Sequence, residues 1–259
     1  MKLLKVIAHL LDYPTQEVID NLDELIQVVS ADQSLPVAQR EAILELIRSW
    51  SIQDIYDLQE QYDGLFERGR HVSLLLFEHV HGESRDRGQA MVDLLGVYQS
   101  NGFELNSEQM PDYIPLFLEF LSAQEEGFAR EWLADVSHIL ALLEERLQQR
   151  GANYQALFNV LLTLSGVQVD RADIKARVAK ENPGDTLEDI DREWEDKEVR
   201  FDDPIEGGEA CSLSNICTTS ASSPDEIEIP AASITAAHSA GGRQQPENWH
   251  QRFTNKADR

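Results

Sequence analysis

Hydrophobic residues recur at helical spacing along most of the chain. The first stripe runs from Leu3 to Leu11 and stops before Pro14, because proline disfavours an α conformation in the residue that precedes it. Later stripes lie within residues 18–29, 43–50, 55–66, 91–98, 128–147 and 157–164. Gly151 follows the longest of them, as glycine commonly follows a helix end. Sustained strand alternation is absent, so the pattern predicts an all-α protein of roughly eight to eleven helices.

The character of the chain changes near Pro183-Gly184. A charged helix is expected from Asp185 to about Phe201, and small, polar and proline residues dominate after it. Such a segment buries too little apolar surface to offset its ordering entropy. We therefore expect a helical domain over 1–201 and an acidic, largely disordered tail over 202–259. The two cysteines, Cys211 and Cys217, lie in this tail without a usual zinc spacing.

The charge balance limits the classes of partner. The 259 residues carry 22 Lys and Arg against 47 Asp and Glu, a formal net charge of −25. Phosphate binding needs basic surfaces, so nucleic acid and anionic lipid are disfavoured and a basic partner is favoured. The longest apolar run, Ile139–Leu143, is far shorter than the ~20 residues of a membrane helix. Because Lys5 and His9 interrupt the N-terminal apolar stretch, it does not read as a signal peptide, and a cytoplasmic protein is expected.

Motifs for catalysis are sparse. No phosphate-binding glycine loop, HExxH or CxxC occurs. The densest polar cluster contains Glu78, His79, His81 and Asp86, which is compatible with a helical metal-dependent hydrolase. However, residues two apart on a helix point about 200° apart, so His79 and His81 share a ligand set only at a bend. A polar loop with helix caps is the favoured interpretation.

Two further clusters combine aromatic, apolar and acidic residues. One contains Tyr62, Leu65 and Phe66, and the other extends from Glu108 to Phe120 and includes Asp112 and Tyr113. Ordinary core packing with a capping acid explains both. The alternative is an apolar groove edged with carboxylates, which suits an amphipathic helix or an extended segment bearing Arg or Lys.

The segment Ser73–Leu95 closely resembles a block of the NarJ family, the molybdenum cofactor assembly chaperones, or delta subunits, of respiratory nitrate reductase. The Tyr-x-x-Leu-Phe sequence at 62–66 and the Pro-Asp-Tyr-x-Pro-Leu-Phe-Leu-Glu sequence at 111–119 are similar to the motifs of the same family, and so are Ile139–Leu143 and residues 194–201. The resemblance covers roughly residues 1–201 and returns faintly at His250-Gln251-Arg252.

The resemblance implies a single helical domain of the TorD/DmsD type, whose members are chaperones and not enzymes. It implies binding to the N-terminal, leader-like segment of the apo catalytic (alpha) subunit of nitrate reductase. The client is held in the cytoplasm, without membrane insertion of the chaperone, while the molybdopterin-guanine-dinucleotide cofactor and an iron–sulfur cluster are inserted. The chaperone itself keeps no permanent cofactor. Proteins of molybdenum cofactor biosynthesis are further implied partners.

The resemblance also implies a peptide site. In related leader-binding chaperones, the two motifs border the leader, and they map here to Tyr62, Leu65, Phe66, Glu108, Pro111, Asp112 and Tyr113. This chain departs from the pattern in two ways: Gln109 and Met110 separate the acid from the proline, and Tyr113 stands where many relatives have histidine. The match of Glu108 is therefore looser than that of Asp112. We expect Asp112 to pair with a basic leader residue.

Overall fold

The computed structural model describes residues 1–181 except 69, 83 and 106–108, and all of these belong to one unit. Several expectations lie outside the described residues. They are the site residue Glu108, the charged helix from Asp185 to about Phe201, the tail over 202–259, and Cys211 and Cys217 within that tail.

The described part is helical, with twelve α-helices and one π-helical turn, and it contains no named strand. The helices are α1 (Lys2–Leu11), α2 (Gln16–Asp20), α3 (Leu22–Ala31), α4 (Val37–Ser51), α5 (Ile55–Tyr62), the π-helical turn η1 (Asp63–Glu67), α6 (Leu76–His81), α7 (Arg85–Ser100), α8 (Ile114–Ser122), α9 (Glu126–Asp135), α10 (Ser137–Gln149), α11 (Gln155–Ser165) and α12 (Arg171–Val178). The all-α prediction is confirmed. None of these helices is both long and apolar enough to cross a membrane.

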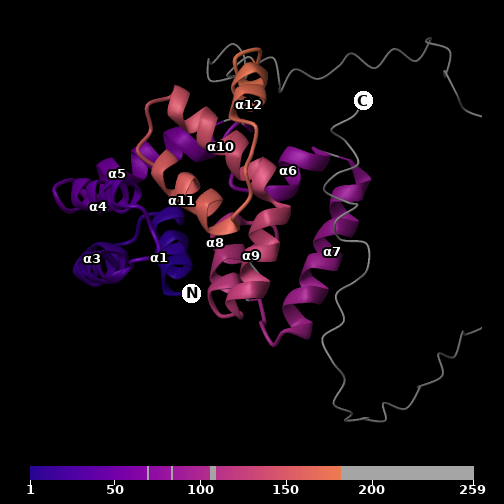
Figure 1. The fold of residues 1–259 in the computed structure, drawn as a ribbon, viewed down its shortest axis with the longest axis horizontal. Helices are drawn as coiled ribbons and strands as arrows, with labels where there is room; N and C mark the ends of the chain where they lie inside the picture. The colour runs from indigo at the N-terminus through magenta and orange to yellow at the C-terminus, as the bar shows by residue number, and fades with distance from the viewer. Residues whose placement is uncertain (69, 83, 106–108, 182–259) are drawn as a thin grey trace, which may run out of the picture. The chain divides into compact units, whose positions relative to one another are not determined.

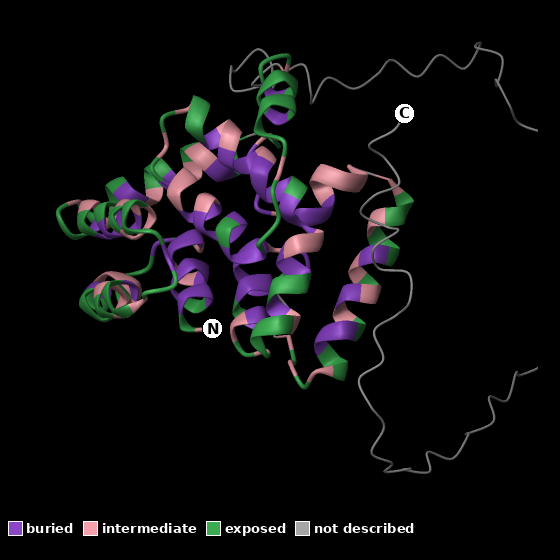
Figure 2. Cartoon of the chain, in the orientation of Figure 1, coloured by how far each residue is buried: buried purple, intermediate pink, exposed green. Residues whose placement is uncertain are grey.

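The core lies around α1 and α8, which pack against each other between the other helices (Figure 1). The first predicted stripe forms the buried face of α1, and Lys2, Lys5 and His9 occupy its other face. Helix α8 is almost entirely buried, as its colour in Figure 2 shows, because its sequence is nearly all apolar. Burial of apolar surface therefore explains why these two helices form the centre of the fold.

The predicted number of helices, eight to eleven, is too small for the described residues. The single stripe over 128–147 is divided into α9 and α10 at Val136, whose φ of −93° and ψ of 3° leave the α-helical region. Apolar spacing continues through this break without proline or glycine, so the stripe does not reveal it. The mostly polar α12 lacks a stripe as well. Asp170 caps its first turn by accepting from the backbone N–H groups of Ala172 (3.0 Å) and Asp173 (3.2 Å).

Candidate functional site

Two of the family-like segments lie side by side. An isolated antiparallel bridge joins Leu75 to Tyr113. In this bridge the backbone N–H of Leu76 donates to the carbonyl of Asp112 (2.9 Å), and the N–H of Ile114 donates to the carbonyl of Leu74 (2.8 Å). The segment that begins α6 is thereby fixed beside the segment that begins α8. Neighbouring residues in this extended stretch point in opposite directions, so Asp112 and Tyr113 enter different surroundings.

Asp112 lies inside the fold with an exposed fraction of 0%. Its Oδ2 accepts from the backbone N–H of Phe77 (3.1 Å), which caps the first turn of α6, and lies 3.7 Å from a guanidinium nitrogen of Arg87. Burial raises the pKa of Asp112, whereas Arg87 and the Phe77 N–H act in the opposite direction. In this conformation the carboxylate is not at the surface, so the direct ion pair with a leader that the sequence predicts would require displacement of Arg87.

Tyr113 instead enters a hydrogen-bonded network with Tyr62 and Asp12. Its hydroxyl donates to Oδ1 of Asp12 (2.9 Å) and lies 3.1 Å from the hydroxyl of Tyr62. The Tyr62 hydroxyl also donates to the carbonyl of Leu11 (3.0 Å), one of the carbonyls that the end of α1 leaves without a helical partner. Burial raises the pKa of both tyrosines, so the two hydroxyls keep their protons. We call Tyr62, Tyr113 and Asp12 the Tyr–Asp network.

An aromatic cluster surrounds Tyr62, which is 1% exposed. Its ring centroid lies 4.8 Å from that of Phe66, 5.5 Å from that of Tyr13 and 6.4 Å from that of Tyr154. Phe66 is also buried and meets Tyr154 at 5.0 Å in an edge-on contact. Such aromatic pairs contribute stabilising energy beyond that of their buried area. Tyr62 and Phe66 therefore stabilise the packing between α1 and α5.

Two cavities flank the exposed face of α1. The larger one, of about 710 Å³, is called here the α1–α3 cavity. It is lined by Lys2, Lys5, Val6, His9, Asp12, Tyr13, Thr15, Glu17, Val18, Asn21, Glu24, Leu25 and Val28. The smaller one, of about 70 Å³, is called the α1–α8 cavity and is lined by Lys5, Ala8, His9, Asp12, Gln109, Tyr113, Pro115, Leu116 and Glu119. Asp12 lines both cavities, together with Lys5 and His9.

A third hollow, the α4–α5 cavity, has a volume of about 390 Å³. Its lining includes Trp50 of α4, Leu58 of α5, Leu65 of η1 and Tyr154 before α11. Leu65 is half-buried at this wall. Because Tyr62 contacts both Tyr13 and Tyr154, one aromatic cluster separates the α4–α5 cavity from the α1–α3 cavity.

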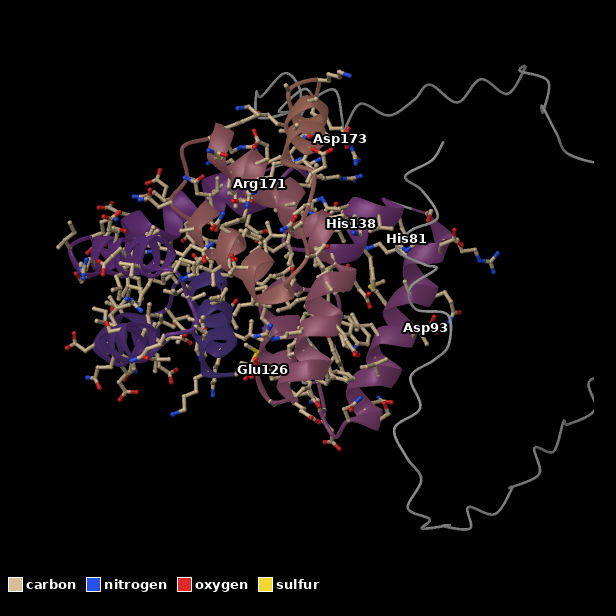
Figure 3. All side chains as sticks on the ribbon, viewed as in Figure 1. His81, Asp93, Glu126, His138, Arg171 and Asp173 are labelled. Carbon is tan, nitrogen blue, oxygen red and sulfur yellow. The ribbon has the colours of Figure 1, made fainter. Side chains whose placement is uncertain are left out.

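The histidine cluster does not have the arrangement of a metal site. Nε2 of His79 donates to the carbonyl of Ser73 (2.8 Å), and its Nδ1 faces the guanidinium of Arg146 at 3.3 Å. The pKa of His79 is lowered to about 4, because burial and, to a smaller extent, the charge of Arg146 together outweigh the opposing hydrogen bond to Ser73. His81 lies at the end of α6 (Figure 3). Across the described part of the chain, no three His, Cys, Asp or Glu side chains form a group that could hold a metal ion, so the hydrolase alternative is not supported.

The structure brings together only some of the seven residues predicted for the site. Tyr62 and Tyr113 meet directly, and Phe66 packs on Tyr62, whereas Asp112 points away into the fold. Leu65 opens onto a separate cavity, and the carbonyl of Pro111 accepts from the Tyr98 hydroxyl of α7 (2.8 Å). Asp12 was missed by sequence reasoning, because Asp12-Tyr13-Pro14 reads as the end of a helix. The available signal was an acid placed at the end of the polar stripe formed by Lys2, Lys5 and His9.

Comparison with known proteins shows consistent similarity. The family model described as nitrate reductase delta subunit matches residues 10–159. The chain is 43% identical over 198 residues, 76% of its length and 84% of the relative, to the nitrate reductase molybdenum cofactor assembly chaperone NarJ of Escherichia coli (strain K12). It is 42% identical over 203 residues, 78% of its length and 84% of the relative, to the probable chaperone NarW of that strain. It is 30% identical over 159 residues, 60% of its length and 84% of the relative, to the probable nitrate reductase molybdenum cofactor assembly chaperone NarJ of Bacillus subtilis (strain 168).

Proposed function

The chain belongs to the nitrate reductase delta subunit family, a family of assembly chaperones and not of enzymes, and on that premise we propose that it matures a respiratory nitrate reductase. Its client is the apo catalytic (alpha) subunit. The chaperone binds the N-terminal, leader-like segment of this subunit and supports insertion of its molybdenum cofactor before membrane attachment. Since insertion precedes attachment, this role places the chaperone in the cytoplasm.

The cofactor in this proposal is cargo that ends in the client. The proposed cargo is molybdopterin-guanine-dinucleotide, accompanied by an iron–sulfur cluster, and proteins of molybdenum cofactor biosynthesis are the proposed donors. The names of the relatives support assembly of a molybdenum cofactor in general. The chaperone's own part is to keep the client open and unattached.

The observation that carries the leader-binding proposal is the position of the Tyr–Asp network. Two residues from separate family-like motifs, Tyr62 and Tyr113, meet through their hydroxyls beside cavities that lie along α1. The cavities combine apolar walls, such as Val6, Val18 and Leu25, with charged rims. This combination suits a short amphipathic segment with basic residues. We place the leader along α1 and across Tyr13 toward Leu65. Phe66 packs against the ring of Tyr62 and supports it in this position.

In this arrangement Asp112, Pro111 and Glu108 have separate roles. Asp112 orients Tyr113 by fixing the bridge beside α6, and the Tyr98 hydroxyl holds Pro111 through its carbonyl. Glu108 lies outside the described residues, and we propose its part in leader binding on the similarity of its motif alone.

The test is titration of the full-length chain with a synthetic peptide that comprises the N-terminal segment of the client's catalytic subunit. A scrambled peptide of the same composition is the control. We expect saturable binding of the native peptide alone, weakened by added salt because the charged component is screened. A pull-down from cells blocked in molybdopterin synthesis should recover the immature catalytic subunit. Equal binding of both peptides, or recovery of only the mature enzyme, would contradict the proposal.

A further inference from the structure

A basic leader needs an accessible carboxylate, and the buried Asp112 does not offer one in this structure. Asp12 does. It is half-buried at the end of α1 and lines both the α1–α3 and the α1–α8 cavities. The family-like motifs lie after position 61 in the chain, but the network that contains Tyr113 ends on this acid near the N-terminus.

The carboxylate of Asp12 is held through one oxygen and leaves the other available. Oδ1 accepts from the Tyr113 hydroxyl (2.9 Å) and from the backbone N–H of Tyr13 (2.9 Å). Oδ2 accepts no hydrogen bond from the described residues. A carboxylate that is already oriented loses little conformational freedom on binding, so its pairing with a cation costs less.

The position of Asp12 adds a second source of negative potential. Asp12 follows the last residue of α1, where the unpaired carbonyls of a helix carry a partial negative charge. Lys2 stands at the other end of the same helix face, Lys5 and His9 lie between it and Asp12, and α1 is roughly 15 Å long at ~1.5 Å per residue. The charge along this face therefore changes from positive to negative toward Asp12. A cation is attracted to the Asp12 end and repelled from the Lys2 end.

From this geometry we infer that Asp12, oriented by Tyr113, is the carboxylate that pairs with a guanidinium or ammonium group of the client's N-terminal segment. The inference rests on the proposed leader binding and deepens it in two respects. It identifies the residue that binds the basic residue of the leader. It also gives the orientation of the leader, whose basic residue lies at the C-terminal end of α1.

A double-mutant cycle tests the inference on the full-length chain. Asp12→Asn keeps the size of the side chain and the backbone at the end of α1, and it removes the charge. Calorimetry with the native leader peptide should show about tenfold weaker binding, as expected for loss of one charge-assisted hydrogen bond. Peptides with single basic residues replaced by glutamine identify the partner: the loss caused by Asp12→Asn should disappear for one of these peptides and persist for the others.

Asp57→Asn is the matched control, because Asp57 is exposed on α5 and lines none of the three cavities. It should change the affinity less than twofold. An unchanged thermal midpoint of Asp12→Asn establishes that the effect lies in binding. If Asp12→Asn binds the native peptide as tightly as the unmodified chain does, the assignment is wrong while the leader-binding proposal stands. If the unmodified chain fails to bind the native peptide, the leader-binding proposal itself is wrong, and the assignment falls with it.

Discussion

Asp112 and Tyr113 are neighbours in the chain, yet they belong to two polar clusters with opposite exposure to solvent. Asp112 forms part of what we call the α6 anchor, in which it and the half-buried Arg87, His79 and Arg146 connect α6 to α7 and α10. Tyr113 belongs to the Tyr–Asp network, which borders two open cavities. The acid of this short motif contacts the start of α6 inside the fold, and we propose that the neighbouring aromatic residue borders the leader surface.

The largest expected effect separates the two clusters through stability. Asp112→Ala should lower the free energy of unfolding by about 3–5 kcal/mol, because it removes the ion-pair partner of the largely buried Arg87 and the acceptor of the Phe77 N–H. Denaturant titration measures the loss. Glu60→Ala, at an exposed position on α5, is the control and should change stability by less than about 0.5 kcal/mol. Equal midpoints for the two variants would show that Asp112 does not hold α6.

The α6 anchor should also respond to acid through His79. Its pKa is lowered from 6.5 to about 4 in the fold, so the folded state binds fewer protons than the unfolded state between these values. The stability that neutral His79 contributes is therefore complete above pH 6.5 and is lost as the pH falls through about 4. The loss amounts to about 3 kcal/mol.

His79→Gln should remove this part of the acid dependence, because glutamine does not titrate and still offers a donor toward Ser73. Chemical denaturation at several pH values between 7 and about 4 compares the variant with the unmodified chain, so that the other titrating groups cancel. If the free energy of unfolding depends on pH in the same way for both proteins, His79 titrates alike in the folded and unfolded states. His79 would then not belong to the α6 anchor.

Within the Tyr–Asp network, stability and binding should separate. Tyr62→Phe removes the donor of the buried Leu11 carbonyl and should cost about 1–2 kcal/mol of folding free energy. Tyr113→Phe, at a half-buried position, should cost less stability and weaken leader binding about fivefold, because Asp12 loses the hydroxyl that orients it. Thermal unfolding of the two variants measures the loss of stability, and calorimetry with the leader peptide measures the loss of affinity. The reverse pattern would assign Tyr113 to the core and Tyr62 to the client surface.

The sequence predicted the parts of the fold that depend on local spacing. The stripe from Leu3 to Leu11 is the buried face of α1, and Gly151 has a φ of 66° after α10, where residues with a side chain are strained. The break at Val136 was not predicted, because it arises where two helices change direction and not from a helix-breaking residue. Local spacing carries no information of that kind.

The sequence identifies residues of the candidate site, but it does not predict the directions of their side chains. The directions of Asp112 and Tyr113 follow from the bridge to Leu75, a pairing between segments 38 residues apart that periodicity does not encode. Asp12 enters the site only because α1 packs on α8 and brings it next to Tyr113. Motif similarity identified Tyr62 and Tyr113, but the acid between the cavities required the tertiary structure.

The smallest expected effect concerns how far the client surface extends beyond the Tyr–Asp network. Leu65 is half-buried and lines the α4–α5 cavity, on the far side of the aromatic cluster from α1. If the leader crosses Tyr13 and reaches this cavity, Leu65→Ala should weaken its binding three- to fivefold, about 1 kcal/mol, because an apolar contact of modest area is lost. Leu142→Ala is the matched control, a half-buried leucine of α10 that lines none of the three cavities, and it should leave the affinity unchanged. Equal affinities for both variants would restrict the leader to the cavities along α1 and leave Leu65 a packing residue, like Phe66.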